Sequence, residues 1–253
     1  MVARAGGGPA FFGLGAQQAG VTWLYERLRR HPQLRVSHVG RDFRAWEQMP
    51  TLRDFANAYR RRYGRTEPGC LHGEITSTHA TLAPEQIAVM RRDHPDLRLF
   101  YLLRSPVERA WTAALLALER ATMGPDEASD AWFVDHFRSA RSRGHGDYVT
   151  CLRNWHAHYL PEQLHVMVVD DLRRQPRDVL RGLYRHLGVS EEAADPPEAA
   201  QLEGLDRAGE QPLPARFRRE LLDVYRRPVR ELGDYLGRDL GHWLAPAAAE
   251  VAR

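Results

Sequence analysis

The amino-acid sequence predicts an α/β fold, a three-layer sandwich in which helices flank a central parallel sheet. Short apolar runs typical of buried strands alternate with longer helical stretches, in the order β, α, β, α, β, α. The clearest buried strand is the run LRLFYLL at residues 97–103. A glycine-rich turn between Gly13 and Gly20 joins the first strand directly to a helix. A chain of 253 residues is long enough to bury one sizeable core, so we expect residues 1–253 to form a single domain.

The first strand is expected at residues 10–14. The helix after it starts near Val21 and carries Trp23, Leu24 and Leu28 on its buried side. It should end at His31 and Pro32, because proline cannot continue a helix. The elements expected next, in chain order, are an extended piece at 34–36, a helix at 51–63, a strand at 71–75 and a helix at 84–93.

The helix after the central strand has the best-marked start. Ser105 suits the N-cap, Pro106 suits the first helical position, and Glu108 lies three residues after the cap, where it would complete a capping box. We expect this helix to run from Pro106 to about residue 122. The elements expected after it are helices at 131–141 and 147–159, a strand at 164–169, and helices at 176–187 and 214–232.

Glycine and proline residues indicate where two of these later helices end or change direction. The helix at 176–187 has its apolar residues on one face and Gly188 as its terminator. Residues 190–213, rich in Glu, Ala and Pro, are interpreted as a loop or lid. Pro228 should break or kink the last helix, because it removes a backbone donor.

Charge and composition argue against several classes of function. Lysine is absent, so all 36 basic residues are arginine, and 33 acidic residues leave a formal net charge of +3. This balance is not that of a nucleic-acid-binding protein. No run approaches the roughly 20 apolar residues that cross a membrane. Cys70 and Cys151 lie far apart and lack metal-ligand spacing, so we expect no disulfide, no metal site and a reducing cytoplasm.

The turn from Gly13 to Gly20 has the shape of an anion-binding loop. Its glycines would let the backbone approach an anion closely, and the amides that open the helix near Val21 would point at it. The sequence has neither the Gly-Lys-Ser/Thr ending of a nucleotide loop nor a dinucleotide fingerprint, since Gln18 stands where the third glycine would be. A tight turn without a ligand is the alternative interpretation.

Arg104 follows the central strand directly, and Thr112 lies about two helical turns farther on. The planar guanidinium group of arginine suits phosphate oxygens, and a helix N-terminus adds amide donors. An arginine that caps the sheet edge is the alternative. The carboxyl ends of parallel strands meet at one edge of the sheet, so the glycine loop and Arg104 are both expected there.

Together, the segments AQQAGVTWLYERLRRHPQL and LFYLLRSPVERAWTAAL resemble two signatures of the sulfotransferase family, whose members transfer a sulfuryl group from 3'-phosphoadenosine 5'-phosphosulfate (PAPS). The likeness continues through HGEITS, GDYVTCLRNW, LHVMVVDDLRRQPRDVLRGLYRHLGV and LGRDLGHWL, nearly the whole chain. It implies a P-loop-like sulfotransferase fold, PAPS or its product PAP as cofactor, and a small-molecule acceptor. The implied cofactor-binding residues are Gln18, Ala19, Gly20, Val21, Thr22, Arg104 and Thr112.

The sequence departs from the family at the reacting centre. Where the loop usually reads Lys-x-Gly-Thr-Thr, this chain has Gln18-Ala19-Gly20-Val21-Thr22, so the lysine and one hydroxyl are missing. After the second strand the family places a Lys-Glu pair; here the stretch is His38-Val39-Gly40-Arg41-Asp42, with neither in register. The implied catalytic residues are His38, Arg41, Asp42 and Glu74. His38 or Asp42 would be the base, and Arg41 with Gln18 would replace the lysine.

Three functions follow from this pattern. The first is a sulfotransferase with a rebuilt charge clamp, transferring sulfuryl from PAPS to an acceptor hydroxyl. The second is a sulfotransferase-fold enzyme that catalyses a PAPS-independent acid-base reaction, such as a cyclisation, elimination or rearrangement, in natural-product biosynthesis. The third is a non-catalytic protein that binds a nucleotide. The arginine-rich, lysine-free composition is typical of bacterial high-GC genomes, in which such enzymes often serve secondary metabolism.

Overall fold

The computed structural model describes residues 9–38, 69–193 and 211–245. These residues divide into two compact units. The first unit holds the described residues up to 103 together with 151–193, and the second holds 104–150 with 211–245. The expected helix at 51–63 and most of the expected lid at 190–213 lie outside the described residues. The single domain expected from the sequence stays a prediction.

A parallel sheet forms the first unit. Its strands are β1 (Phe11–Gly13), β2 (Leu34–His38), β3 (Leu71–Ile75), β4 (Arg98–Leu103) and β5 (Leu164–Val168), all of them predicted. Their order across the sheet is β2-β3-β1-β4-β5, and every pairing is parallel. The chain leaves β1 toward β2 on one side, whereas β4 flanks β1 on the other. The carboxyl end of β1 is therefore a switch point, where ligands of α/β sheets usually bind.

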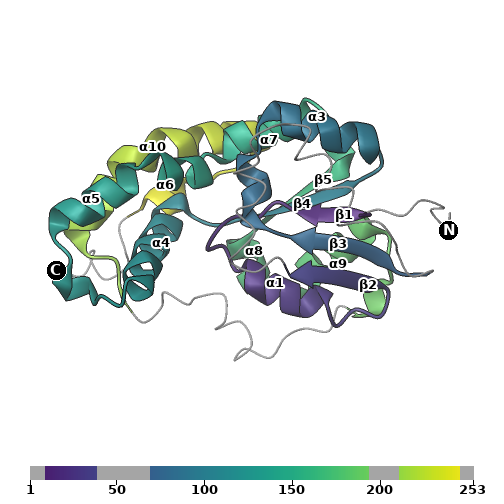
Figure 1. Ribbon diagram of the computed structural model, residues 1–253, viewed down its shortest axis with the longest axis horizontal. Helices are drawn as coiled ribbons and strands as arrows, with labels where there is room; N and C mark the ends of the chain where they lie inside the picture. Colours follow the sequence, from purple (N-terminus) through teal and green to yellow (C-terminus); the bar gives the residue numbers. More distant parts are fainter. Residues whose placement is uncertain (1–8, 39–68, 194–210, 246–253) are drawn as a thin grey trace. The chain divides into compact units, whose positions relative to one another are not determined.

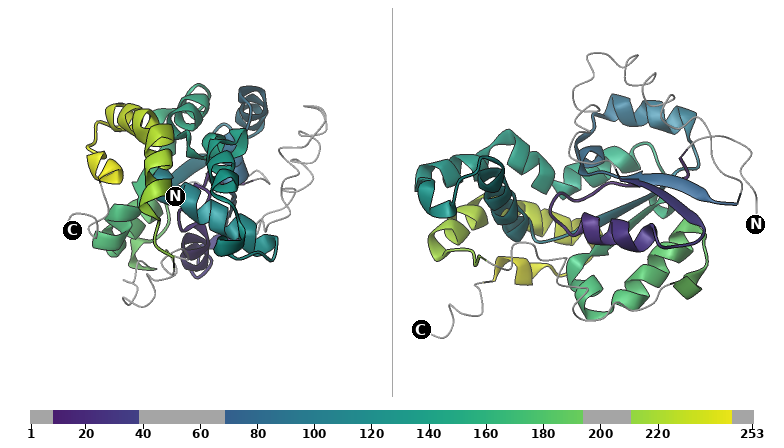
Figure 2. Two further views of the ribbon diagram at one scale, coloured as in Figure 1. Left: turned by 90° about the vertical axis from the view of Figure 1, so that its left-hand side faces the viewer. Right: turned by 60° about the horizontal axis from the view of Figure 1, so that its bottom comes forward.

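Helices cover both faces of this sheet. The helices of the first unit are α1 (Val21–Leu28), η1 (Ser77–Thr81), α3 (Pro84–Asp93), the part of α7 (Tyr148–His156) from residue 151 on, η3 (Pro161–Gln163), α8 (Val169–Arg174), α9 (Pro176–Leu187) and η4 (Glu191–Ala193), the η elements being 3-10 helices. Figure 1 shows α1 and α9 on one face and α3 on the other, an arrangement that the right-hand view of Figure 2 repeats. His31, just after α1, packs edge-on against Tyr184 of α9. The predicted three-layer α/β architecture is confirmed.

Apolar residues hold the first unit together. From Leu99 to Leu103 every residue of β4 is buried, as its continuous apolar sequence predicted. The predicted glycine terminator of α9 is also confirmed, since Gly188 adopts a left-handed conformation with φ 71°. One boundary was wrong: β5 ends at Val168, because Val169 already begins α8.

The second unit is helical. Its elements are α4 (Pro106–Arg120), η2 (Pro125–Glu127), α5 (Asp130–Arg138), α6 (Ala140–Gly146), the start of α7 (Tyr148–His156), α10 (Ala215–Leu236) and η7 (Gly241–Leu244). α4, α5 and α10 pack around an aromatic cluster in which the rings of Trp111, Phe133 and Phe217 lie within 5.8 Å of one another. Along the described ranges, no helix combines the length and apolarity that crossing a membrane requires.

Two expectations about where helices end in the second unit were wrong. The helix expected at 131–141 is interrupted, because Ser139 leaves the helical conformation and its hydroxyl accepts the amide of Ser142 to start α6. Pro228 does not break α10, which is one helix from Ala215 to Leu236, whereas the kink expected as the alternative stays a prediction. A continuous buried face that includes Tyr225, Val229 and Leu232 compensates for the hydrogen bond lost at the proline.

Candidate active site

The loop between β1 and α1 is shaped by its backbone. Gly15 has φ +122° and Gly20, the N-cap of α1, has φ +83°, values that L side chains rarely adopt. Ala16 donates its amide to the carbonyl of Leu102 at 2.8 Å, and Leu102 donates back to Gly15 at 2.9 Å. These two bonds fasten the start of the loop to β4, two residues before Arg104 in the chain.

The amino end of α1 opens from this loop. The helix's first backbone bond runs from the amide of Leu24 to the carbonyl of Gly20 at 3.1 Å, so the amides of Val21, Thr22 and Trp23 precede the bonded part of the helix. Such amides and the positive end of the helix dipole are suited to an anion. The geometry therefore agrees with the phosphate-binding character expected of this loop.

The five loop residues singled out in the sequence form one continuous segment. Ala19 is buried, Gln18, Gly20 and Val21 are half-buried, and Thr22 is exposed. Gln18 has a left-handed backbone, with φ 61°. The half-buried amide of Gln18 is neutral, so any charge on a bound anion must be matched by the helix end or by other groups.

Arg104 and Thr112 belong to the second unit and share a neighbour, Glu108. Arg104 is 6% exposed and donates from Nε to Oε2 of Glu108 at 3.0 Å. Thr112, 3% exposed, donates its hydroxyl to the backbone carbonyl of Glu108, also at 3.0 Å. Glu108 thus contacts both Arg104 and Thr112, the two residues that the family resemblance implies as ligands of the 3'-phosphate.

The predicted capping box at Ser105 was wrong. Ser105 is the N-cap residue of α4, but its side chain makes no capping hydrogen bond. The carboxylate that should have completed the box is bonded to the guanidinium of Arg104 instead. A charge-assisted bond to arginine is stronger than a bond to a backbone amide, so it wins the competition. The i,i+4 spacing of Arg104 and Glu108 was the signal that the sequence interpretation missed.

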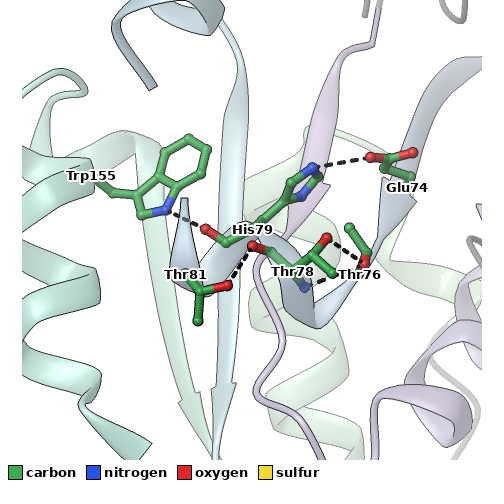
Figure 3. A network of polar contacts seen from close by, with 6 residues as sticks. All are labelled: Glu74, Thr76, Thr78, His79, Thr81 and Trp155. Atoms are coloured by element: carbon green, nitrogen blue, oxygen red, sulfur yellow. Dashed lines mark hydrogen bonds and ion pairs between the residues drawn. The ribbon is translucent and has the colours of Figure 1, made fainter. Parts of the chain in front are cut away.

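Glu74, one of the expected catalytic residues, lies beneath the surface of the first unit. Its Oε1 is 3.0 Å from Nε2 of His79, and neither side chain is exposed. The two groups form an ion pair when the imidazole is protonated, and their geometry is not that of a hydrogen bond. Figure 3 shows the pair beside the turn after β3, where the carbonyl of His79 accepts the indole N–H of Trp155 at 3.1 Å. Sequence reasoning missed His79, five residues after the glutamate.

The other expected catalytic residues lie near the end of β2. His38 is the last residue of β2, and its backbone is in register with Ile75 of β3. Since β2 is two strands away from β1, the carboxyl ends of these strands are about 10 Å apart. Arg41 and Asp42 lie outside the described residues.

The chain matches the family model described as "Sulfotransferase domain" over residues 10–201. Among solved structures, a sulfotransferase from Alicyclobacillus acidocaldarius is 20% identical, with a TM-score of 0.68 over 96% of this chain and 100% of the other. A mouse sulfotransferase solved with PAP is 12% identical, with a TM-score of 0.56 over 90% of this chain and 88% of that one.

A sulfotransferase domain from an olefin synthase of Synechococcus PCC 7002 is 15% identical, with a TM-score of 0.52 over 94% of this chain and 97% of the other. At these identities the likeness to solved structures shows the fold alone. No curated protein matches the chain. The family model covers well over half of the 253 residues. The chain therefore belongs to the sulfotransferase domain family.

Proposed function

We propose that this protein transfers a sulfuryl group from PAPS to the hydroxyl of a small molecule, at a catalytic centre that lacks the family's usual lysine. One observation carries the proposal: Leu102 of β4 bonds to both Gly15 and Ala16 of the glycine loop, and Arg104 follows Leu102 by two residues. The presence of PAP in the mouse relative supports the choice of cofactor.

In the proposal, a separate group of residues binds each anionic end of PAPS. In the proposal the amides at the start of α1 hold the 5'-phosphosulfate, because Gly15 and Gly20 leave room for close approach. Arg104 holds the 3'-phosphate with its planar guanidinium group. Thr112 assists only after its hydroxyl leaves the carbonyl of Glu108, to which it donates now. Bound PAPS supplies a sulfuryl group whose bridging oxygen gains negative charge as the S–O bond breaks.

The chain's own residues then handle the proton and the developing charge. In the proposal His38 or Asp42 removes the acceptor's proton as the new O–S bond forms, and Gln18 donates a neutral hydrogen bond toward the leaving oxygen. Arg41 supplies the positive charge that lysine supplies elsewhere, although its planar group reaches such an oxygen differently from a compact ammonium. The complete burial of Glu74 favours a supporting role for it beside the acceptor pocket.

A second candidate function rests on the neutral loop. Half-buried Gln18 stands where a cation is usual, which favours a PAPS-independent acid-base reaction on a natural product as the second candidate. In that reaction His38, Arg41, Asp42 and Glu74 would surround the substrate. The olefin-synthase domain among the structural relatives supports a biosynthetic setting.

Calorimetric titration with PAP separates the two candidates. We expect saturable binding that weakens at least 10-fold in Arg104→Ala, about 1.4 kcal/mol or more. Arg120→Ala is the matched control, because Arg120 is an exposed arginine on the same helix. Absence of binding at roughly 1 mM PAP would exclude the PAPS-dependent function and leave the acid-base reaction.

A further inference from the structure

The backbone of Arg104 is held by a buried tyrosine. The hydroxyl of Tyr148 donates to the carbonyl oxygen of Arg104 at 2.9 Å. The helix itself first uses the carbonyl of Ser105, which accepts the amide of Arg109, so the carbonyl of Arg104 lies one residue before the helical bonds begin. Ser105 has a non-helical backbone, with φ −43° and ψ 120°. The Tyr148 bond therefore holds this junction from outside the helix.

Resting on the proposed function, we propose that Tyr148 is a positioning residue for Arg104. It orients the arginine so that the site selects nucleotides with a 3'-phosphate. The direction of an arginine side chain depends on the backbone that carries it, and a guanidinium group binds phosphate best in a restricted, two-pronged geometry. A hydrogen bond on the adjacent carbonyl restricts that backbone.

Tyr148 is itself firmly placed. It is 2% exposed, and burial raises the pKa of its phenol, so the hydroxyl keeps its proton and stays a donor. The preceding residue, Asp147, accepts the amide of Thr150 at 3.1 Å and its hydroxyl at 2.8 Å, the pattern of an N-cap side chain. This cap fixes the start of α7, where Tyr148 is the first residue.

A second buried group secures α6, the helix that leads into Tyr148. Arg109 of α4, with no exposed surface, donates to the carbonyl of Ser142 at 2.8 Å and to the hydroxyl of Tyr225 at 3.1 Å. Tyr225 of α10 in turn donates to the same carbonyl at 3.1 Å. A methyl group at Gly146 would lie 2.6 Å from the Tyr225 ring, so the end of α6 packs directly on α10. Helix α6, which ends two residues before Tyr148, is thus bound to α4 and α10 together.

The side chain of Arg104 is restrained separately. Glu108 accepts from Nε, so the two Nη groups lie on the other edge of the planar guanidinium. Tyr148 restrains the carbonyl and Glu108 restrains the guanidinium. Loss of the hydroxyl should therefore leave Arg104 present and charged but less well oriented, which affects the 3'-phosphate and not the rest of the nucleotide.

Calorimetry with two nucleotides tests this. The full-length protein and its Tyr148→Phe variant are titrated with PAP and with AMP, which lacks the 3'-phosphate. We expect the ratio of the AMP Kd to the PAP Kd to fall about 10-fold in Tyr148→Phe, about 1.4 kcal/mol, with AMP binding unchanged. In an Arg104→Ala background the same substitution should change the ratio no further, because the residue acts through Arg104.

Tyr159→Phe is the matched control. The hydroxyl of Tyr159, 1% exposed, donates to the carbonyl of His94 in the first unit at 3.3 Å, so the substitution removes the same kind of bond elsewhere. It should leave the ratio of the AMP Kd to the PAP Kd unchanged.

Two outcomes would overturn the positioning role while the proposed function stands. One is a Tyr148→Phe variant whose Kd ratio equals that of the unmodified protein. The other is a Tyr148→Phe substitution that lowers the ratio as much in the Arg104→Ala background as in the unmodified protein. If the unmodified protein does not prefer PAP to AMP, the donor site itself is wrong and the inference falls with it. Should Tyr148→Phe fail to fold, Asp147→Ala, which removes the cap that places Tyr148, must lower the same ratio or the inference is refuted.

Discussion

Nε2 of His79 lies 3.0 Å from Oε1 of Glu74, and neither side chain has any exposed surface. The pair links β3 to the 3-10 helix that follows it, and the ring of His79 also packs on Phe12 of β1, with 4.4 Å between ring centroids. A buried charge is tolerated only with a partner, because desolvation costs several kcal/mol per ion. The pair therefore holds the turn at the carboxyl end of β3.

We expect His79→Ala to lower the free energy of unfolding by about 2–5 kcal/mol, because it removes a fully buried ring that packs on Phe12 and Trp155 and ends its contact with Glu74. Glu74→Gln removes the charge but keeps the shape, and we expect it to cost less, about 1–2 kcal/mol. Urea unfolding followed by circular dichroism measures both. In the double variant the losses should be less than additive by at least about 1 kcal/mol. Strict additivity would mean that the two groups do not interact.

Gln18→Lys restores the cation that the family places in this loop. We expect the release of sulfate from PAPS to rise about 10- to 1,000-fold, because a positive charge stabilises the leaving oxygen more than a neutral amide does. Both side chains carry a Cβ, so the left-handed backbone at this position is strained equally before and after the change. Gln17→Lys is the matched control. Gln17 is also half-buried, and its substitution introduces the same positive charge one residue earlier in the loop. A rate equal to that of the unmodified protein would show that another group already supplies the charge.

Glu108→Gln should strengthen PAP binding. The substitution keeps an oxygen that can accept from Nε of Arg104 but removes a negative charge beside the expected 3'-phosphate. The Glu108 side chain is 43% exposed, so we expect a modest gain, about 2- to 5-fold in Kd, that shrinks as salt increases. Titration calorimetry at low and high salt measures it, with the exposed Glu119→Gln of the same helix as control. Weaker binding would mean that the carboxylate's hold on Arg104 matters more than its charge.

His145 should make stability depend on pH. Burial, and then the charges of Arg109 and Arg141, lower the pKa of this imidazole from 6.5 to about 4. Between these values the unfolded chain binds a proton that the folded protein excludes, so stability is full above about pH 6.5 and falls as the pH drops toward 4. At about 1.4 kcal/mol for each unit of pKa, the loss from His145 approaches about 3 kcal/mol.

Thermal unfolding from pH 7.5 down to about 4.5 checks this expectation. The variant His145→Gln should show a flatter dependence of stability on pH, because its side chain does not titrate. The matched control is His242→Gln, which replaces an exposed histidine of the same unit. Burial also lowers the pKa of His186 to about 4, so a smaller acid sensitivity should remain in the variant. An unchanged slope in His145→Gln would contradict the expectation.

Local signals were sufficient for most of the elements. The buried run of β4, the proline at the start of α3 and the left-handed Gly188 after α9 each act within a few residues, so sequence alone located these elements. The glycine loop was found for the same reason, because the conformations of Gly15 and Gly20 are properties of single residues.

Contacts between segments distant in the sequence decided the features of the fold that local signals do not determine. The strand order β2-β3-β1-β4-β5 depends on which apolar faces pack together, and no local pattern states it. The same holds for His79 beside Glu74, Tyr148 on the carbonyl of Arg104, and the helix that continues through Pro228. The sequence alone determined that this chain has a parallel α/β sheet, a glycine loop without a lysine, and an arginine directly after the buried strand β4. Only the tertiary structure decided which groups are buried, paired and held in place. Burial and pairing depend on interactions between distant segments, and the chain brings these segments together only when it folds.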